Sequence, residues 1–378
     1  MEFQFSKYRN LFPSLNHYTQ LSSCSQSAIS TPVKKAVQEY MNSWEQFGMD
    51  WMGWVEAAET ARKYFAELIN AEVEEVAIVS SVSHAASAIA TALEFSDNRN
   101  EIVTTDMDFP TIGHVWQSQQ SRGASTKFIS SVNDYIPIEF YDKTLSSQTL
   151  LTSIAQIAYY NGFEQDVKKI TELAHSKGSY IFVDAYQSAG NVSIDVKESN
   201  VDFLTSGLQK YLLGIPGVAF LYIKKEIAEK LNPKITGWFG QDNPFLFDIK
   251  DLTYKKGAQR FDSGTAPMIN CFAAKEALNL ILEVGMNKIE SYLKELSAFT
   301  ISYAQKNSLE IKSPTDTALK GSNTAIYVEN ANEIEASMRR KGIIVSARRD
   351  VIRIAPHFYN SKEDITRAID LLVETIQE

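Results

Sequence analysis

Cysteine is scarce in this chain of 378 residues, because only Cys24 and Cys271 occur. Two cysteines are too few for a disulfide framework, and free thiols are typical of proteins in a reducing cytoplasm. Long apolar runs are missing as well, since no stretch approaches the roughly 18 residues of a membrane-spanning helix. The first residues also lack the apolar core of an export signal. We therefore expect a cytoplasmic protein without a membrane-spanning segment.

Basic charge is in short supply too. Lys and Arg total 37 against 46 for Asp and Glu, which gives a net charge of -9. An acidic chain without a basic cluster argues against nucleic acid or an anionic membrane as a partner. The 5 histidines are scattered singly, and none pairs with Cys or another His at metal-ligand spacing. We expect no metal site.

What the chain does contain is a series of short runs rich in β-branched and apolar residues, separated by segments with helical periodicity such as 83–95 and 166–178. Strand, helix and strand in succession predict right-handed crossovers and an α/β fold. We expect a mainly parallel seven-stranded sheet with helices on both faces, because several of the runs are continuously apolar. The candidate strands are 75–81, 101–106, 126–131, 156–160, 179–185, 201–206 and 217–224.

The pattern changes beyond about residue 255. A long helix is predicted over 267–285, and two strands, 324–330 and 351–356, precede a closing helix. The length allows about two domains. We therefore expect an N-terminal arm and large domain over 1–255, and a small α+β domain over 256–378. Ligands of such parallel sheets bind at the carboxyl ends of the strands.

Two charged residues follow neighbouring predicted strands. Asp184 ends a buried run, where a carboxylate is costly unless it meets a positive group. Lys210 lies just beyond the next run. Taken singly, the first can be a structural cap and the second can extend to solvent. Taken together, they are the two groups that pyridoxal phosphate (PLP) chemistry needs. The amine condenses with the aldehyde of the cofactor, and the carboxylate keeps its pyridine nitrogen protonated.

From Tyr18 to the C-terminus the sequence resembles the class V aminotransferases, which have the fold-type I PLP-dependent transferase architecture. The group includes cysteine desulfurases, selenocysteine lyases, kynureninase and isopenicillin N epimerase-like proteins. Its strand that ends in Asp-x-x-Gln and its S-x-H-K-like lysine element are matched by 184–187 and 206–210. The resemblance implies that Lys210 carries PLP as a Schiff base, and that Asp184 contacts the pyridine nitrogen.

The same resemblance assigns further cofactor contacts. Gln187 is expected to hydrogen-bond the phenolic oxygen of the cofactor. Gln209 stands where the family has a histidine, and it can still donate to the phosphate without any charge. Gly207 replaces a hydroxyl residue that is often found there, and it can offer only its backbone. These two exchanges are the departures from the family pattern around the lysine.

Phosphate donors are expected at the strand–turn–helix segment 79–90, because helix N-termini bind anions. The resemblance selects the backbone amide of Val82 and the amide and hydroxyl of Ser83, although an ordinary serine cap is the commoner use of such a turn. Thr265, in the segment 261–267, resembles a family Gly-Thr pair that reaches the phosphate of the neighbouring subunit. The resemblance thereby implies a homodimer with shared active sites.

Three more positions complete the expected site. Phe109 lies where the family stacks an aromatic ring on the cofactor, and stacking tolerates Phe. Asn161 lies where a cofactor- or substrate-contacting Asn is often found. Arg353 resembles the family arginine that pairs with the α-carboxylate of the substrate, and bidentate recognition suits a guanidinium in a strand. An intramolecular salt bridge is the alternative for Arg353.

The reaction is expected to be transamination of an amino acid. A PLP-dependent lyase, an epimerase or a kynureninase-like hydrolase shares the same motifs, so these stay open. A cysteine desulfurase is disfavoured, because no cysteine follows Cys271, which itself falls in a predicted helix. A PLP-fold binding module without activity is disfavoured because Lys210 and Asp184 are both present. An aromatic set is expected either to line the substrate pocket or to pack in a dimer: Trp44, Trp51, Trp54 and Trp238.

Overall fold

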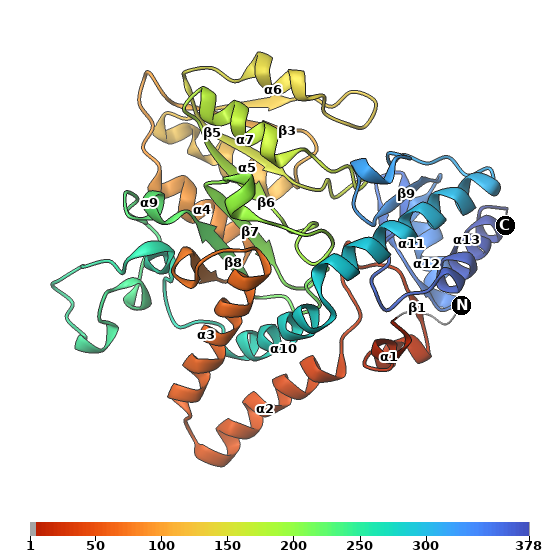
Figure 1. Cartoon of the computed structure of the whole chain (residues 1–378), viewed down its shortest axis with the longest axis horizontal. Coiled ribbons are helices and arrows are strands. Elements are labelled where there is room, and N and C mark those ends of the chain that lie inside the picture. Colours follow the sequence, from red (N-terminus) through yellow and green to blue (C-terminus); the bar gives the residue numbers. More distant parts are fainter. Residues whose placement is uncertain (1–4, 378) are drawn as a thin grey trace.

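The computed structural model describes residues 5–377 and has a seven-stranded sheet at its centre, in the order β2-β8-β7-β6-β5-β3-β4 (Figure 1). Strand β8 runs antiparallel to both of its neighbours, and all other pairs are parallel. The expected mainly parallel sheet is therefore confirmed. Its strands are β2 (Val76–Val79), β3 (Glu101–Thr105), β4 (Ser125–Ile129), β5 (Thr149–Ala155), β6 (Tyr180–Asp184), β7 (Phe203–Gly207) and β8 (Ala219–Ile223).

Side chains of this sheet are buried on both faces. In β6, for example, Val183 belongs to one apolar cluster and Phe182 to another, and in β7 the same holds for Leu204 and Phe203. Alternate residues of a strand point to opposite faces, so helices must cover both. The connecting helices are α4 (Val82–Ala92), α5 (Pro110–Gln117), α6 (Ile138–Thr144), α7 (Val167–Ser176), α8 (Val196–Ser199) and α9 (Lys225–Ala228).

One predicted strand is wrong. The segment 156–160 is not a strand, and β5 ends just before it. The polar residues of β5 interrupt its apolar pattern, so the sequence did not indicate a strand there. One of them, Thr152, is nevertheless buried with a hydrogen-bond partner, because its hydroxyl oxygen lies 2.9 Å from that of Ser179. Buried hydroxyls with partners are tolerated within a sheet, so the apolar run beside them was the misleading signal.

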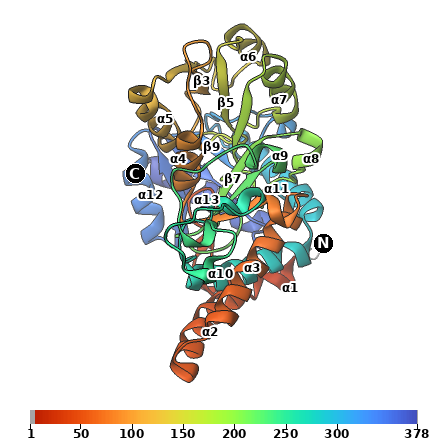
Figure 2. The ribbon, with the colours of Figure 1, turned by 90° about the vertical axis from the view of Figure 1, so that its left-hand side faces the viewer.

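Helices α2 (Thr31–Phe47) and α3 (Trp51–Leu68) form a hairpin that projects from the body of the molecule (Figures 1 and 2). Ser30 caps the first of them by accepting a hydrogen bond from Val33 N, and Asp50 caps the second through Gly53 N. Helix α10 (Met268–Val284) packs against both, and it confirms the long helix expected there.

The rest of the chain forms a smaller α+β unit around an antiparallel sheet in the order β11-β12-β9. Its elements are α11 (Met286–Lys306), β9 (Thr324–Tyr327), α12 (Ala331–Arg340), β10 (Ile343–Ile344), β11 (Ser346–Arg348), β12 (Val351–Ile354) and α13 (Lys362–Gln377). A domain boundary between residues 255 and 256 remains a proposal, because α10 packs on the α2–α3 hairpin.

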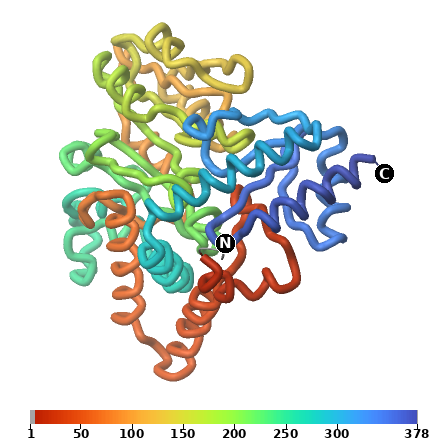
Figure 3. Tube along the Cα trace, turned by 45° about the vertical axis from the view of Figure 1, so that its right-hand side comes forward, coloured from red at the N-terminus to blue at the C-terminus, as the bar shows by residue number. Residues whose placement is uncertain are grey.

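The N-terminal segment is bound to this smaller unit. After α1 (Ser6–Arg9), strand β1 (Thr19–Gln20) pairs in parallel with β10. The red start of the chain accordingly lies beside the blue C-terminal part in Figure 3. No helix among residues 5–377 is long and apolar enough to span a membrane.

Candidate active site

Asp184 and Lys210 lie at the carboxyl ends of the adjacent strands β6 and β7. Asp184 is 5% exposed, and its Oδ1 accepts a hydrogen bond of 2.9 Å from the backbone amide of Tyr186. Its other oxygen has no hydrogen-bond partner within residues 5–377. Burial raises the pKa of Asp184, while the neighbouring Lys210 opposes that rise. The second oxygen is thus free to hold a positively charged N–H group.

The amine of Lys210 lies between two aromatic rings. Its Nζ is 4.1 Å from the ring centre of Tyr186 and 5.7 Å from that of Phe109. No side chain of the described residues forms a hydrogen bond or ion pair with this nitrogen. Burial lowers the pKa of Lys210 to about 8, although Asp184 acts to raise it. A lysine with a lowered pKa and no fixed partner is a ready nucleophile.

These groups fit pyridoxal phosphate. The free carboxylate oxygen of Asp184 suits the protonated pyridine nitrogen, and the Lys210 amine suits the aldehyde. Phe109 is 40% exposed, so one face of its ring is open for stacking. The same ring packs edge-on against Tyr159, with 5.2 Å between the ring centres. The site therefore offers an amine, a carboxylate and an aromatic face in one place.

The expected phosphate donors lie at the start of α4. Ser81 caps this helix by accepting a hydrogen bond from His84 N, and the first intrahelical bond runs from Ala85 N to Ser81 O. The amides of Val82 and Ser83 precede that bond, so they have no intrahelical acceptor and are available to an anion. Their phosphate role stays a prediction that the geometry allows.

The segment 22–27, which we call the N-terminal strap, crosses the lysine turn. Gln187 Nε2 donates to Cys24 O over 2.9 Å, and Ser27 Oγ donates to Lys210 O over 2.7 Å. Gln209 Nε2 lies 3.5 Å from Ser25 O. Both glutamines predicted to contact the cofactor thus also hold the strap, which the sequence did not indicate.

Arg353 is buried in β12 without a negatively charged partner. It is 1% exposed, and no carboxylate among residues 5–377 forms an ion pair with it. Its Nη1 donates to Tyr159 O over 2.6 Å, and its Nη2 donates to the hydroxyls of Ser25 and Ser346 over 2.8 and 2.6 Å. The alternative of an intramolecular salt bridge is therefore not what the structure has.

The N-terminal strap links Arg353 to the lysine turn, because Ser25 Oγ accepts from Arg353 and Ser27 Oγ donates to Lys210 O. Burial lowers the pKa of Arg353, and its positive charge is one of the causes that lower the pKa of Lys210. A buried cation that meets only neutral acceptors is costly unless an anion joins it. The arrangement favours an anionic ligand next to the amine of Lys210.

Two of the predicted cofactor-binding residues, Asn161 and Thr265, do not point their hydrogen bonds towards the lysine site. The side chain of Asn161 donates to Asp134 O over 2.7 Å and accepts from Phe163 N over 3.0 Å. These bonds hold a loop, so the geometry gives its cofactor contact no support. Thr265 is exposed and makes no hydrogen bond to the lysine site within the described part of one chain. Sequence reasoning missed Tyr159, although it lies only two residues before Asn161.

Both cysteines are free and buried. Burial raises the pKa of Cys271, which lies within α10, to about 12, so this thiol is not ionised near neutral pH.

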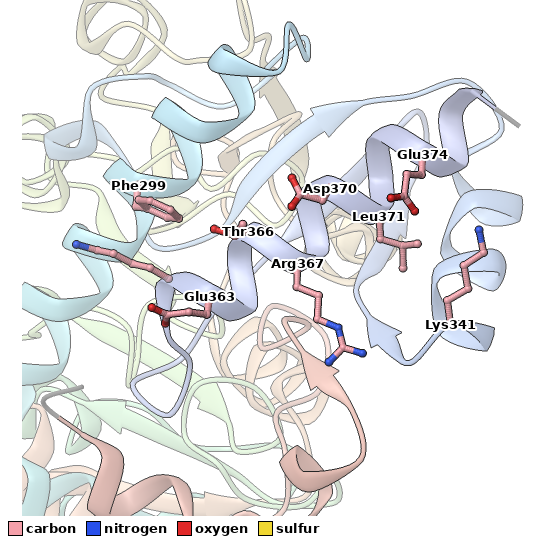
Figure 4. A pocket seen from close by; sticks show the side chains of 9 residues that line it. Phe299, Lys341, Glu363, Thr366, Arg367, Asp370, Leu371 and Glu374 are labelled. Carbon is pink, nitrogen blue, oxygen red and sulfur yellow. The ribbon is translucent and has the colours of Figure 1, made fainter. Parts of the chain in front are cut away.

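A pocket with charged walls is found elsewhere, over the outer face of α13. Its lining includes Phe299, Glu363, Arg367 and Glu374 (Figure 4). None of these residues belongs to the lysine site.

Comparisons with known proteins identify the family of the chain. Residues 21–367 match the family model described as aminotransferase class-V. An uncharacterized aminotransferase of Bacillus subtilis, YcbU, is 44% identical and covers 98% of both chains. A kynureninase of Bacillus cereus is 26% identical over 93% of this chain and 86% of its own.

A solved structure shows the same fold. A variant of the cystine C-S lyase C-DES, with glycine covalently linked to its PLP cofactor, has a TM-score of 0.89 at 19% identity and covers 97% of this chain and 99% of its own. The family match spans nearly the whole described chain, and it includes the strand ends that carry Asp184 and Lys210. The chain belongs to the aminotransferase class-V family.

Proposed function

We propose that this chain is a PLP-dependent aminotransferase that acts on an amino acid. The observation that carries the proposal is the buried guanidinium of Arg353, which has no carboxylate partner among residues 5–377 and is linked to the Lys210 turn by the N-terminal strap. An α-amino acid brings both groups that this pair lacks, a carboxylate for the arginine and an amino group for the lysine-bound aldehyde. Class membership and the relative named an aminotransferase support the reaction.

Each residue then has a defined task. When bound, the cofactor supplies the electron sink that lets a proton leave the α-carbon of an amino acid. Asp184 keeps a proton on the pyridine nitrogen through its free oxygen. Arg353 orients the α-carboxylate, and Phe109 covers the ring. Lys210 Nζ, with a pKa of about 8, can take the α-proton near neutral pH and donate it again at a different atom, as amino transfer requires.

A lyase-type reaction is the second candidate, and one observation favours it. A protein named a cystine C-S lyase, C-DES, has the same fold, and a kynureninase matches over 93% of this chain. The desulfurase variant of such chemistry is not supported, because the thiol of Cys271 is buried in a helix and un-ionised. Transamination and cleavage differ in where the amino nitrogen goes.

The test therefore follows that nitrogen. The PLP-loaded protein is incubated with 15N-labelled amino acids and a mixture of 2-oxo acids, and the products are analysed by mass spectrometry. Transfer of the label to an oxo acid, lost in Lys210→Ala, is the expected result. Release of a side-chain fragment without label transfer would establish the lyase instead. If the parent protein does neither, the proposal is refuted. An unchanged far-UV spectrum of Lys210→Ala shows that its loss of activity is not a loss of folding.

We further propose a cytoplasmic homodimer with shared sites. The support is an exposed apolar patch on the α2–α3 hairpin and the segment 245–252. Trp51 of the hairpin stacks on Trp238 at 5.9 Å, which joins the two parts. The patch comprises Trp44, Phe47, Met49, Met52, Phe245, Leu246, Phe247, Ile249 and Leu252. Patches of this kind usually mark an interaction surface.

The patch also adjoins the predicted Gly-Thr element. Gly237, next to Trp238, lies so close to Ser263 O that a side chain there has no room. Thr265, two residues further on, is exposed beside it. A second copy that covers the patch therefore comes within reach of Thr265, as shared sites require.

The two buried, unpaired thiols support a reducing compartment.

Sedimentation equilibrium tests this assembly. The variant Ile249→Glu places a charge at a position that is 95% exposed in one chain, so it should not disturb the fold, yet it should dissociate a dimer. Ile376→Glu is the matched control, since Ile376 is 45% exposed on α13, on the far side of the molecule. A monomeric parent protein, or an Ile249→Glu dimer of unchanged strength, would count against the proposal.

A further inference from the structure

Tyr186 fills the space that the missing side chain at Gly207 leaves. A Cβ atom added to Gly207 would fall on the ring of Tyr186 and lie 2.5 Å from its hydroxyl oxygen. No larger residue fits at position 207 while the ring stays in place. The phenolic oxygen therefore lies close to where a serine at position 207 would carry its own hydroxyl.

This hydroxyl is at the phosphate end of the site. Gly207 is the neighbour of Ala219 in the sheet, and Ala219 is in turn the neighbour of Val79, the last residue of β2. Helix α4 begins shortly after Val79. The ring of Tyr186 packs against the same apolar cluster that contains Val79 and Val82. Tyr186 and the free amides of the α4 N-terminus thus share one face and one end of the sheet.

The hydroxyl is a donor without an acceptor. It makes no hydrogen bond with any residue of the described chain. Burial, together with the charge of Asp184, raises the pKa of Tyr186 to about 12, so the phenol keeps its proton. Ser206 does not compete for the role, because its own hydroxyl donates to Gly207 O over 3.0 Å.

We propose that the Tyr186 hydroxyl donates a hydrogen bond to the phosphate of the cofactor, in place of the hydroxyl that Gly207 lacks. The inference rests on the proposed PLP-dependent function. The ring of Tyr186 already lies 4.1 Å from Lys210 Nζ. The aldehyde and the phosphate occupy neighbouring positions on the cofactor ring, so one side chain can lie against both.

Binding of PLP and of pyridoxal, which lacks the phosphate, tests this role without any turnover. Tyr186→Phe removes only the hydroxyl. Because a hydrogen bond to a charged group contributes about 1.5–3 kcal/mol, the apoprotein should bind PLP about 10- to 150-fold more weakly, with its affinity for pyridoxal unchanged. Equal weakening for both ligands, or no weakening of PLP, would overturn the proposal.

A swap of the two positions is the second arm. Tyr186→Ala clears the space, and Gly207→Ser in that background restores a hydroxyl at the strand end. The pair should regain preference for PLP over pyridoxal, whereas Tyr186→Ala with Gly207→Ala should not. If serine gives no more preference than alanine, the vacated place is not beside the phosphate and the proposal is wrong. A chain that binds PLP but transfers no amino group would refute the proposed reaction and leave this inference standing.

Discussion

Replacing Arg353 by lysine should impair carboxylate binding nearly as much as replacing it by glutamine. A guanidinium has five N–H donors. The structure uses four of them, towards Tyr159 O, Ser25 Oγ, Ser346 Oγ and, at 3.4 Å, Ser346 O. One N–H on Nη1 remains for a substrate. A lysine ammonium has three donors, and the three nearest neutral acceptors would occupy all of them.

The magnitude follows from that single remaining donor. One charge-assisted hydrogen bond contributes about 1.5–3 kcal/mol, which is about 10- to 150-fold in affinity. Both Arg353→Lys and Arg353→Gln should lose affinity for an amino acid in this range. Neither should lose affinity for the corresponding amine without a carboxylate, because that ligand offers the arginine nothing to hold.

The assay is a spectral titration of the PLP-loaded variants with each ligand pair. Arg339→Gln is the matched control, since Arg339 is an exposed arginine of α12 that pairs with Glu335 and is not among the charges that act on Lys210. It should leave the preference for amino acid over amine intact. The reasoning fails if Arg353→Lys binds amino acids like the parent, or if the amine is weakened to the same extent.

Two further results are expected. Since burial lowers the pKa of Lys210 to about 8, the neutral amine appears as pH rises through that value, and the rate of PLP attachment to the apoprotein should rise with a midpoint near pH 8. The midpoint should shift lower in Asp184→Asn, because this variant loses a negative charge that raises the pKa of Lys210. A midpoint near the ordinary lysine pKa of 10.5 would refute the lowered pKa. Asp262→Asn removes a carboxylate that lies 2.8 Å from the buried Arg62, so the free energy of unfolding in urea should fall by about 3 kcal/mol. Glu198→Gln breaks an exposed ion pair with Lys168 and should lower the free energy of unfolding by less than about 1 kcal/mol. Equal losses in the two variants would contradict the role of burial.

The fold was largely predictable from the sequence because its signals are local. Continuous apolar runs such as 179–185 and 217–224 are long enough to identify buried strands, and the sheet rules then order them. The exception is β5, in which Thr149 and Thr152 interrupt the apolar run but have hydrogen-bond partners inside, so that the next apolar segment resembles a strand more closely. Internal satisfaction of hydroxyls cannot be inferred from one segment alone.

The candidate site was predictable where residues follow strands of the central sheet. Asp184 and Lys210 lie at strand ends, and parallel strands bring their carboxyl ends together. Tyr159 and Ser25 were missed because they meet Arg353 across very distant parts of the chain, whereas Ser346 lies opposite Arg353 in the neighbouring strand β11. Such meetings depend on how the smaller unit and the N-terminal strap dock on the sheet. No periodicity within either segment encodes that docking.

The N-terminal strap also bears on how the protein is made. It holds Lys210 through Ser27 and contacts Arg353 through Ser25, and the strand before it pairs with residues 343–344. Domains generally fold in turn as they leave the ribosome. The N-terminal strap is synthesised long before the segments that it contacts and must therefore wait for them, because contacts of such long sequence separation close late. We expect a nascent chain released before β12 to build the central sheet and yet keep an unfinished site, so that completion of synthesis itself governs when the cofactor can be held.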